Sequence, residues 1–121
     1  MDTSQKKTIS VTLSGVDGAA EIKKIMDKFR DNAPAQFNST DIVKTEDFLA
    51  QTATSAAGVE KLTTPPSNVL KYTLADDSWL AVRPSGTEPK IKFYIATVGS
   101  DLADAEAKIA NIEKEINAFV K

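Results

Sequence analysis

Apolar and polar residues alternate along several short stretches of the chain, as they do in half-buried β-strands. Two of these stretches flank the turn-like run Ala75-Asp76-Asp77-Ser78, and a third follows shortly after them. The alternation predicts strands over residues 8–13, 69–74, 79–83 and 91–98. Residues 40–49 are predicted as a further strand, in which Glu46-Asp47 is interpreted as a solvated edge.

Two other stretches carry apolar residues at helical spacing. The first runs from the candidate N-cap Asp17 to the stop at Asn32-Ala33-Pro34, and its apolar face comprises Ile22, Ile25, Met26 and Phe29. The second follows the candidate N-cap Ser100, and its apolar face comprises Leu102, Ala105, Ile109, Ile112, Ile116 and Phe119. A coiled coil is the alternative for the second stretch. Because its repeat is shorter than about three heptads, we predict a helix packed on a sheet.

Residues 51–67 lie between these elements, are rich in Thr, Ala and Ser, and contain Gly58 and Pro65-Pro66. This composition predicts a long loop. The pattern as a whole predicts an α+β domain, an antiparallel sheet with helices packed on one face. We divide the chain into a leading strand and helix, residues 1–34, and a C-terminal domain, residues 35–121, which together form one compact unit.

The composition is that of one soluble globular domain, since 41% of the 121 residues are hydrophobic and 26% are charged. The formal net charge of −2 lacks the basic excess that is usual in nucleic-acid-binding domains. No apolar run approaches the roughly 20 residues needed to span a bilayer. We therefore expect a cytoplasmic protein without a nucleic-acid or membrane partner.

The chain has neither cysteine nor histidine. Their absence excludes thiolate nucleophiles, cysteine-type zinc sites and histidine-based catalytic triads within the chain. Any chemistry must use carboxylates, lysines, hydroxyls or backbone amides. Only two of the 15 basic residues are arginines, Arg30 and Arg83. Because arginine is the side chain best suited to bidentate binding of oxyanions, the positions of these two matter.

The segment Arg83-Pro84-Ser85-Gly86-Thr87-Glu88-Pro89-Lys90 combines residue types that bind anions. Gly86 allows successive backbone N–H groups to turn inward around an anion. Ser85 and Thr87 add hydroxyl donors, and the guanidinium of Arg83 matches the oxygens of a phosphate. If alternate strand residues face the core, Arg83 and Lys92 both point away from it at the two ends of the loop. This is a geometry for binding a phosphate dianion, and it leaves nothing to act as nucleophile or general base, so the pattern indicates binding without catalysis.

A simpler interpretation is that the same segment is only a hairpin loop, because Gly, Ser, Thr and Pro are ordinary loop residues. Glu88 also disfavours a bound phosphate, unless it points away or pairs with Lys90. From the residues alone, both interpretations stay open. The acidic runs Asp76-Asp77 and Asp101/Asp104 are interpreted as a turn and a helix cap rather than as metal ligands.

Residues 83–94 resemble the C-terminal phosphate-binding loop of the α-D-phosphohexomutase family, and are most similar to bacterial members of its phosphoglucomutase/phosphomannomutase group. Further similarity lies in Pro66-Ser67-Asn68-Val69-Leu70-Lys71-Tyr72, Asp77-Ser78-Trp79 and Gly15-Val16-Asp17-Gly18. The resemblance covers nearly the whole chain and implies a fold like the TATA-binding-protein-like domain of these enzymes. It also implies phosphate contacts at Arg83, Ser85, Gly86, Thr87 and Lys92.

The resemblance also implies what the chain lacks, because the phosphoserine, magnesium and sugar-selecting loops of the family belong to three preceding domains. The chain is therefore expected to be the fourth domain of an isomerase that interconverts glucose 1-phosphate and glucose 6-phosphate, and to be inactive alone. Its expected partners are the phosphosugar substrate and the other domains. Mg²⁺ would be bound by those domains, and no cofactor is expected here. The alternative is a stand-alone anion- or protein-binding α+β module without catalysis.

Overall fold

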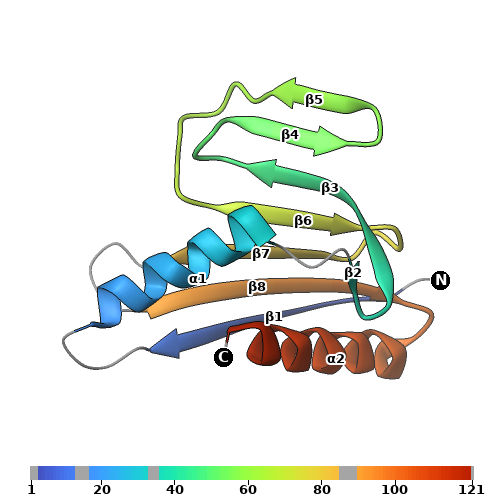
Figure 1. Cartoon of the computed structure of the whole chain (residues 1–121). Helices are drawn as coiled ribbons and strands as arrows, with labels where there is room; N and C mark the ends of the chain where they lie inside the picture. The colour runs from blue at the N-terminus through green and yellow to red at the C-terminus, as the bar shows by residue number, and fades with distance from the viewer. Residues whose placement is uncertain (1–2, 13–16, 33–35, 85–89, 121) are drawn as a thin grey trace.

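Eight strands and two helices make up the part of the chain that the computed structural model describes, residues 3–12, 17–32, 36–84 and 90–120 (Figure 1). In chain order they are β1 (Thr3–Thr12), α1 (Gly18–Asn32), β2 (Gln36–Phe37), β3 (Thr40–Asp47), β4 (Thr52–Ser55), β5 (Gly58–Lys61), β6 (Leu70–Leu74), β7 (Trp79–Pro84), β8 (Lys90–Gly99) and α2 (Leu102–Val120). The sheet order is β1-β8-β7-β6-β3-β4-β5, with β2 paired to β3, and every pairing is antiparallel. The predicted α+β fold is therefore confirmed.

The centre of the sheet is formed by β6, β7 and β8, whose alternate residues are apolar. These apolar side chains are 0–1% exposed and face the helices; they are Leu70, Tyr72, Leu74, Leu80, Val82, Ile91, Phe93 and Ile95. Because successive strand residues point to opposite faces, the residues between them lie on the other face of the sheet. The predicted core faces of these strands are therefore confirmed.

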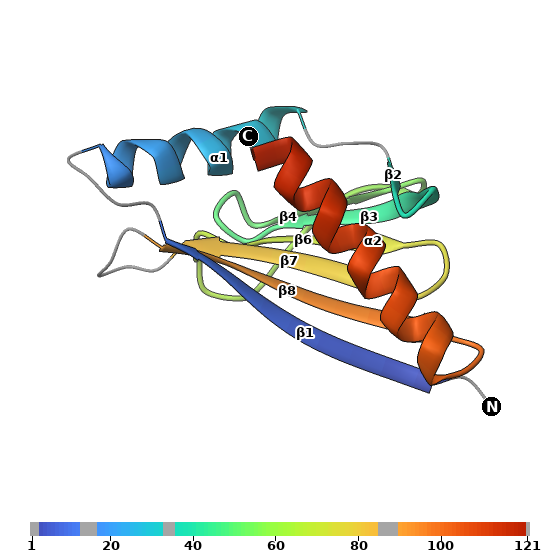
Figure 2. The same ribbon diagram turned by 90° about the horizontal axis from the view of Figure 1, so that it is seen from below.

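Both helices lie on the same face of the sheet, and no described helix covers the opposite face (Figure 2). The longer helix, α2, packs over β8 and β1, whereas α1 packs over β7 and β8. The predicted apolar stripes are buried where their side chains are described, except that Leu102 is 50% exposed at the start of α2. The side chain of Phe119, predicted as the last member of the second stripe, lies outside the described part. Neither helix is long and apolar enough to cross a membrane.

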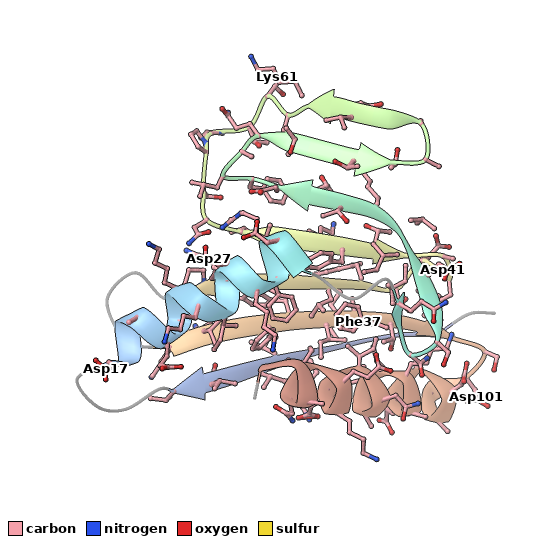
Figure 3. The ribbon with its side chains drawn as sticks, viewed as in Figure 1. Asp17, Asp27, Phe37, Asp41, Lys61 and Asp101 are labelled. Atoms are coloured by element: carbon pink, nitrogen blue, oxygen red, sulfur yellow. The ribbon has the colours of Figure 1, made fainter. Side chains whose placement is uncertain are left out.

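The core is built around Phe29 of α1, whose ring centroid lies 6.2 Å from that of Tyr72 and 5.8 Å from that of Phe93. The hydroxyl of Tyr72 donates a hydrogen bond of 2.7 Å to the carbonyl oxygen of Phe29, so the buried hydroxyl is satisfied. The short strand β2 was not predicted. It places Phe37, which is fully buried, 6.3 Å from the ring of Tyr72 (Figure 3).

The prediction of a loop over residues 51–67 is wrong for its first part, where the hairpin of β4 and β5 forms. The hairpin turns at Ala56-Ala57, and the positive φ of 118° at Gly58 is one that glycine adopts without strain. Only Ala53 of the two strands is buried. An exposed hairpin of small polar residues therefore carries almost none of the apolar alternation that identifies a strand.

The cap predicted at Ser100 is also wrong by one residue. The side chain of Asp101 accepts a hydrogen bond of 2.8 Å from the N–H of Asp104, which is the contact of an N-cap. In return, Oδ2 of Asp104 accepts the N–H of Ser100 at 3.0 Å. Both acidic residues therefore act at the helix start, as the sequence indicated.

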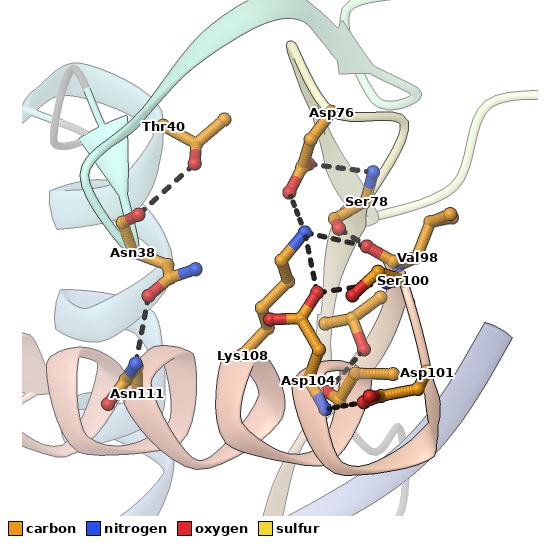
Figure 4. A network of polar contacts seen from close by, with 12 residues as sticks. Asn38, Thr40, Asp76, Ser78, Val98, Ser100, Asp101, Asp104, Lys108 and Asn111 are labelled. Carbon is orange, nitrogen blue, oxygen red and sulfur yellow. Dashed lines mark hydrogen bonds and ion pairs between the residues drawn. The ribbon is translucent and has the colours of Figure 1, made fainter. Parts of the chain in front are cut away.

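A polar network joins the start of α2 to the turn between β6 and β7 (Figure 4). Nζ of Lys108 donates to Oδ2 of Asp76 at 3.0 Å and to the carbonyl oxygen of Val98 at 2.7 Å. Oδ1 of Asp76 accepts the N–H of Ser78 and so closes the turn. A side chain at Gly99 would place its Cβ 2.5 Å from the N atom of Ala105, so this close approach requires glycine.

The network predicts a loss of stability in acid. Burial by itself raises the pKa of Asp76, but its hydrogen bonds and the charge of Lys108 outweigh that effect and lower the pKa below its ordinary value of 3.8. The unfolded chain then takes up this proton at a higher pH than the folded chain does. The stabilisation is therefore fully present above about pH 4 and is lost as the pH falls through the folded-state pKa.

We expect Asp76→Asn to lower the free energy of unfolding at pH 7 by up to about 1 kcal/mol, because the ion pair is partly exposed. The variant should lose less stability than the native chain between pH 7 and pH 3. Urea unfolding at the two pH values measures both effects, with Asp27→Asn on α1 as the control variant. An equal loss in the native chain and in Asp76→Asn would contradict the assignment.

Candidate anion site

Two cations lie directly opposite one another on adjacent strands, near the C-terminal end of β7 and the N-terminal end of β8. The register pairs Arg83 of β7 with Lys92 of β8. Their neighbours Val82 and Phe93 are fully buried on the helix face, so Arg83 and Lys92 lie on the uncovered face. Arg83 is exposed and Lys92 is half-buried. The prediction that both point away from the core is confirmed.

This arrangement places two positive charges side by side on adjacent strands. Directly opposite residues in an antiparallel pair have Cβ atoms about 5 Å apart, and like charges at that distance are destabilising. In the part of the chain that the structure describes, neither Arg83 nor Lys92 has a hydrogen-bond or ion-pair partner. An anion bound between them would remove the repulsion and satisfy their N–H donors.

The remaining predicted contacts are Ser85, Gly86 and Thr87, which belong to residues 85–89 and lie outside the described residues. The same holds for Glu88, whose orientation is a condition of anion binding. Their roles therefore stay predictions. The structure does place the two ends of this segment, Pro84 and Lys90, on adjacent strands.

An open hollow of about 500 Å³ lies beside Arg83 and is lined by Ser67, Asn68, Val69, Arg83 and Pro84. One wall is the segment that precedes β6. Backbone hydrogen bonds fix this wall to Phe48, which donates its N–H to the carbonyl of Val69 and accepts the N–H of Ser67, at 3.0 and 3.2 Å. The hollow is therefore bounded by backbone that is anchored to the sheet.

The other arginine supports this wall from the helix side. Nε of Arg30, at the end of α1, donates to Oδ2 of Asp47 at 2.9 Å, and its Nη2 donates to Oδ1 of Asn68 at 2.9 Å. The carboxylate of Asp47 also accepts the N–H groups of Leu49 and Ala50. Burial by itself raises the pKa of Asp47, but the hydrogen bond from Arg30, the two backbone donors and the charge of Arg30 together lower it.

This network corrects the interpretation of Glu46-Asp47 as a solvated strand edge. The strand β3 lies between β6 and β4 and is not an edge. The side chain of Asp47 is only 15% exposed because it faces α1 and binds Arg30. Of the two arginines, Arg30 is thus engaged within the protein, whereas Arg83 has no protein partner among the described residues.

The site carries donors and positive charge but no group suited to covalent or acid–base chemistry among the residues that the structure describes. Of the carboxylates considered as metal ligands, those of Asp76, Asp101 and Asp104 are engaged by Lys108, by the turn and by the helix cap. Within the described ranges, no three His, Cys, Asp or Glu side chains are grouped so that they could hold a metal ion. These residues therefore do not fit a Mg²⁺ site.

Comparison with known proteins places this α+β domain in a family. The family model described as "Phosphoglucomutase/phosphomannomutase, C-terminal domain" matches residues 14–118. The chain belongs to this family. It is 36% identical over 102 residues to the phosphoglucomutases of Staphylococcus aureus strains bovine RF122 / ET3-1 and MRSA252, and 35% identical to that of strain MSSA476. In each case the match covers 83% of this chain and 18% of the relative's length.

The sequence predicted roles for Arg83 and Lys92, placed Asp47 at a solvated edge, and gave no role to Arg30 or Asn68. Asn68 lies in a stretch that carries the family resemblance, and Arg30 is one of only two arginines. The resemblance at Asn68 and the scarcity of arginine were the features from which these two residues could have been singled out. Nothing in local periodicity indicates that side chains 38 residues apart, Arg30 and Asn68, are hydrogen-bonded.

Proposed function

We propose that the chain is the phosphate-binding C-terminal domain of a phosphoglucomutase and holds the phosphate of the sugar that is not reacting. The observation that carries this proposal is the pair Arg83 and Lys92, two opposed cations without a protein partner among the described residues. The family membership and the names of the relatives support it. The segment with Ser85, Gly86 and Thr87 joins the two strands and would supply hydroxyl and backbone N–H donors to the same phosphate.

The role of this site in the reaction is positioning. In the proposed parent enzyme, a phosphoryl group passes from a serine of another domain to the free O1 or O6 hydroxyl, giving a hexose bisphosphate. The phosphoryl group at the other end then returns to the serine. A site that binds only the phosphate accepts either end of the sugar in turn. Its contribution is orientation of the reacting oxygen rather than bond-making. Mg²⁺ would be held by other domains of the parent enzyme.

The proposal predicts that the purified chain alone converts no glucose 1-phosphate to glucose 6-phosphate above a no-protein control. A chimera in which this chain replaces the matching C-terminal region of the Staphylococcus aureus phosphoglucomutase should be active. The negative control is the Staphylococcus aureus phosphoglucomutase truncated before the same region. Arg83→Ala in the chimera should lower kcat/KM about 10- to 150-fold, the value of one lost charge-assisted hydrogen bond.

Two results would contradict the proposal. One is conversion by the isolated chain. The other is a folded chimera, verified by circular dichroism and size-exclusion chromatography, that is no more active than the truncated enzyme. The second result would favour a stand-alone anion- or protein-binding module.

A further inference from the structure

The segment that precedes β6 brings a second polar side chain to the hollow beside Arg83. Asn68 lines this hollow together with Ser67, Val69 and Pro84. It is exposed, so its amide is accessible from solvent. Arg30 contacts Asn68 from the helix side, and Arg83 lines the same hollow as Asn68.

The contact with Arg30 determines which end of the Asn68 amide is already engaged and which end is left for a ligand. A guanidinium has only donors, so the atom at 2.9 Å from Nη2 must be the amide oxygen Oδ1. The two N–H donors of Nδ2 then lie on the other branch of the amide. Within the described ranges, no protein acceptor receives them.

The donor is also held in place before any ligand binds. Arg30 is fixed by Asp47, whose carboxylate is itself bound by two backbone N–H groups. The segment around Asn68 is fixed by backbone hydrogen bonds to Phe48. A preorganised donor loses little conformational entropy on binding. The positive guanidinium at Oδ1 further polarises the amide and strengthens its N–H groups as donors.

We propose that Asn68 is a further ligand of the phosphate site, and that its side-chain N–H groups donate to the anion held by Arg83. This inference rests on the proposed function and adds one residue to its phosphate site. The phosphate is then contacted from Arg83 and Lys92 on one side and from Asn68 on the other. Arg30 and Asp47 are positioning residues, because they act through Asn68.

The experiment is a titration of the ¹⁵N-labelled 121-residue chain with inorganic phosphate, followed by NMR. The side-chain NH₂ resonances of Asn68 should shift on the same curve as the backbone amides of Ser85, Gly86 and Thr87. Asn68→Ala should weaken phosphate binding about 10-fold or more, the lower end of the range for one hydrogen bond to a charged group. Asn68→Asp should weaken it further, because this variant still accepts from Arg30 but presents a negative oxygen to the phosphate. Asn111→Ala, which removes an exposed asparagine on α2, should bind within twofold of the native chain.

The outcomes separate this inference from the proposed function. One outcome is that phosphate shifts the amides of residues 85–87 but not the NH₂ resonances of Asn68, and that Asn68→Ala binds phosphate within twofold of the native affinity. Asn68 is then not a ligand, and the proposed function stands. If Asn68→Asp binds as well as the native chain, Asn68 serves only as an acceptor for Arg30, and the inference is overturned. If no resonance shifts in the native chain, both proposals fail.

Discussion

Replacing Arg83 by alanine will weaken phosphate binding by the isolated chain about 10- to 150-fold, the equivalent of one charge-assisted hydrogen bond of roughly 1.5–3 kcal/mol. Arg83 is exposed on the uncovered face and has no partner among the described residues, so its removal leaves the core unchanged. It also leaves Lys92 as a single cation opposite a neutral residue. The dissociation constant from an NMR titration with glucose 6-phosphate measures the effect.

Two variants make this result specific to the guanidinium. Arg83→Lys should restore part of the affinity, since an ammonium supplies the charge but not the two parallel N–H donors. Lys61→Ala removes an exposed cation at the opposite edge of the sheet, on β5, and should leave the affinity within twofold of the native value. An equal loss in Lys61→Ala would show that the chain binds phosphate only through its overall charge.

Replacing Phe29 by alanine will cost about 3–5 kcal/mol of folding free energy, which is typical for a fully buried phenylalanine. Phe29 is completely buried and packs on the rings of Tyr72 and Phe93, so its removal separates α1 from the sheet. A domain of this size has a total stability of only about 5–15 kcal/mol. We therefore expect the variant to be partly or wholly unfolded at 37 °C.

Urea unfolding followed by the fluorescence of the single tryptophan, Trp79, measures this loss. Leu49→Ala is the matched control, because Leu49 is apolar but 50% exposed, and it should change stability by less than about 0.5 kcal/mol. A loss below about 1 kcal/mol in Phe29→Ala would show that α1 is not part of the cooperative core.

The central strands could be predicted from the sequence because burial follows their alternation. In β6 and β8, apolar side chains face the helices at every second position, so pattern and structure carry the same information. The hairpin of β4 and β5 could not be predicted in this way. Its strands bury only Ala53, and its turn is Ala56-Ala57 rather than a sequence typical of tight turns.

The short strand β2 was missed for a different reason. Two residues are too few to show any period, and Phe37 is buried through contacts with residues distant in sequence, such as Tyr72. Its place in the core depends on the fold being complete.

The candidate site likewise has a part that could be predicted from the sequence and a part that could not. The orientation of Arg83 and Lys92 follows from local alternation, so it was predictable and is confirmed. The wall formed by Asn68, Arg30 and Asp47 depends on three segments meeting at one end of the sheet. The sequence shows polar or charged residues at these positions, but no local pattern indicates which of them are hydrogen-bonded to one another. Asp47 was accordingly assigned to solvent, although it is the anchor of the network.

The most direct test of the central claim is to map which amides of the ¹⁵N-labelled chain move when glucose 6-phosphate is added. We predict that Ser85, Gly86 and Thr87 shift first, with a dissociation constant of about a millimolar, since the chain supplies phosphate contacts but no sugar contacts. Saturating ligand that leaves these three amides unmoved, or that shifts Asp76 and Asp101 instead, would contradict the account and show that residues 83–90 form only a hairpin loop.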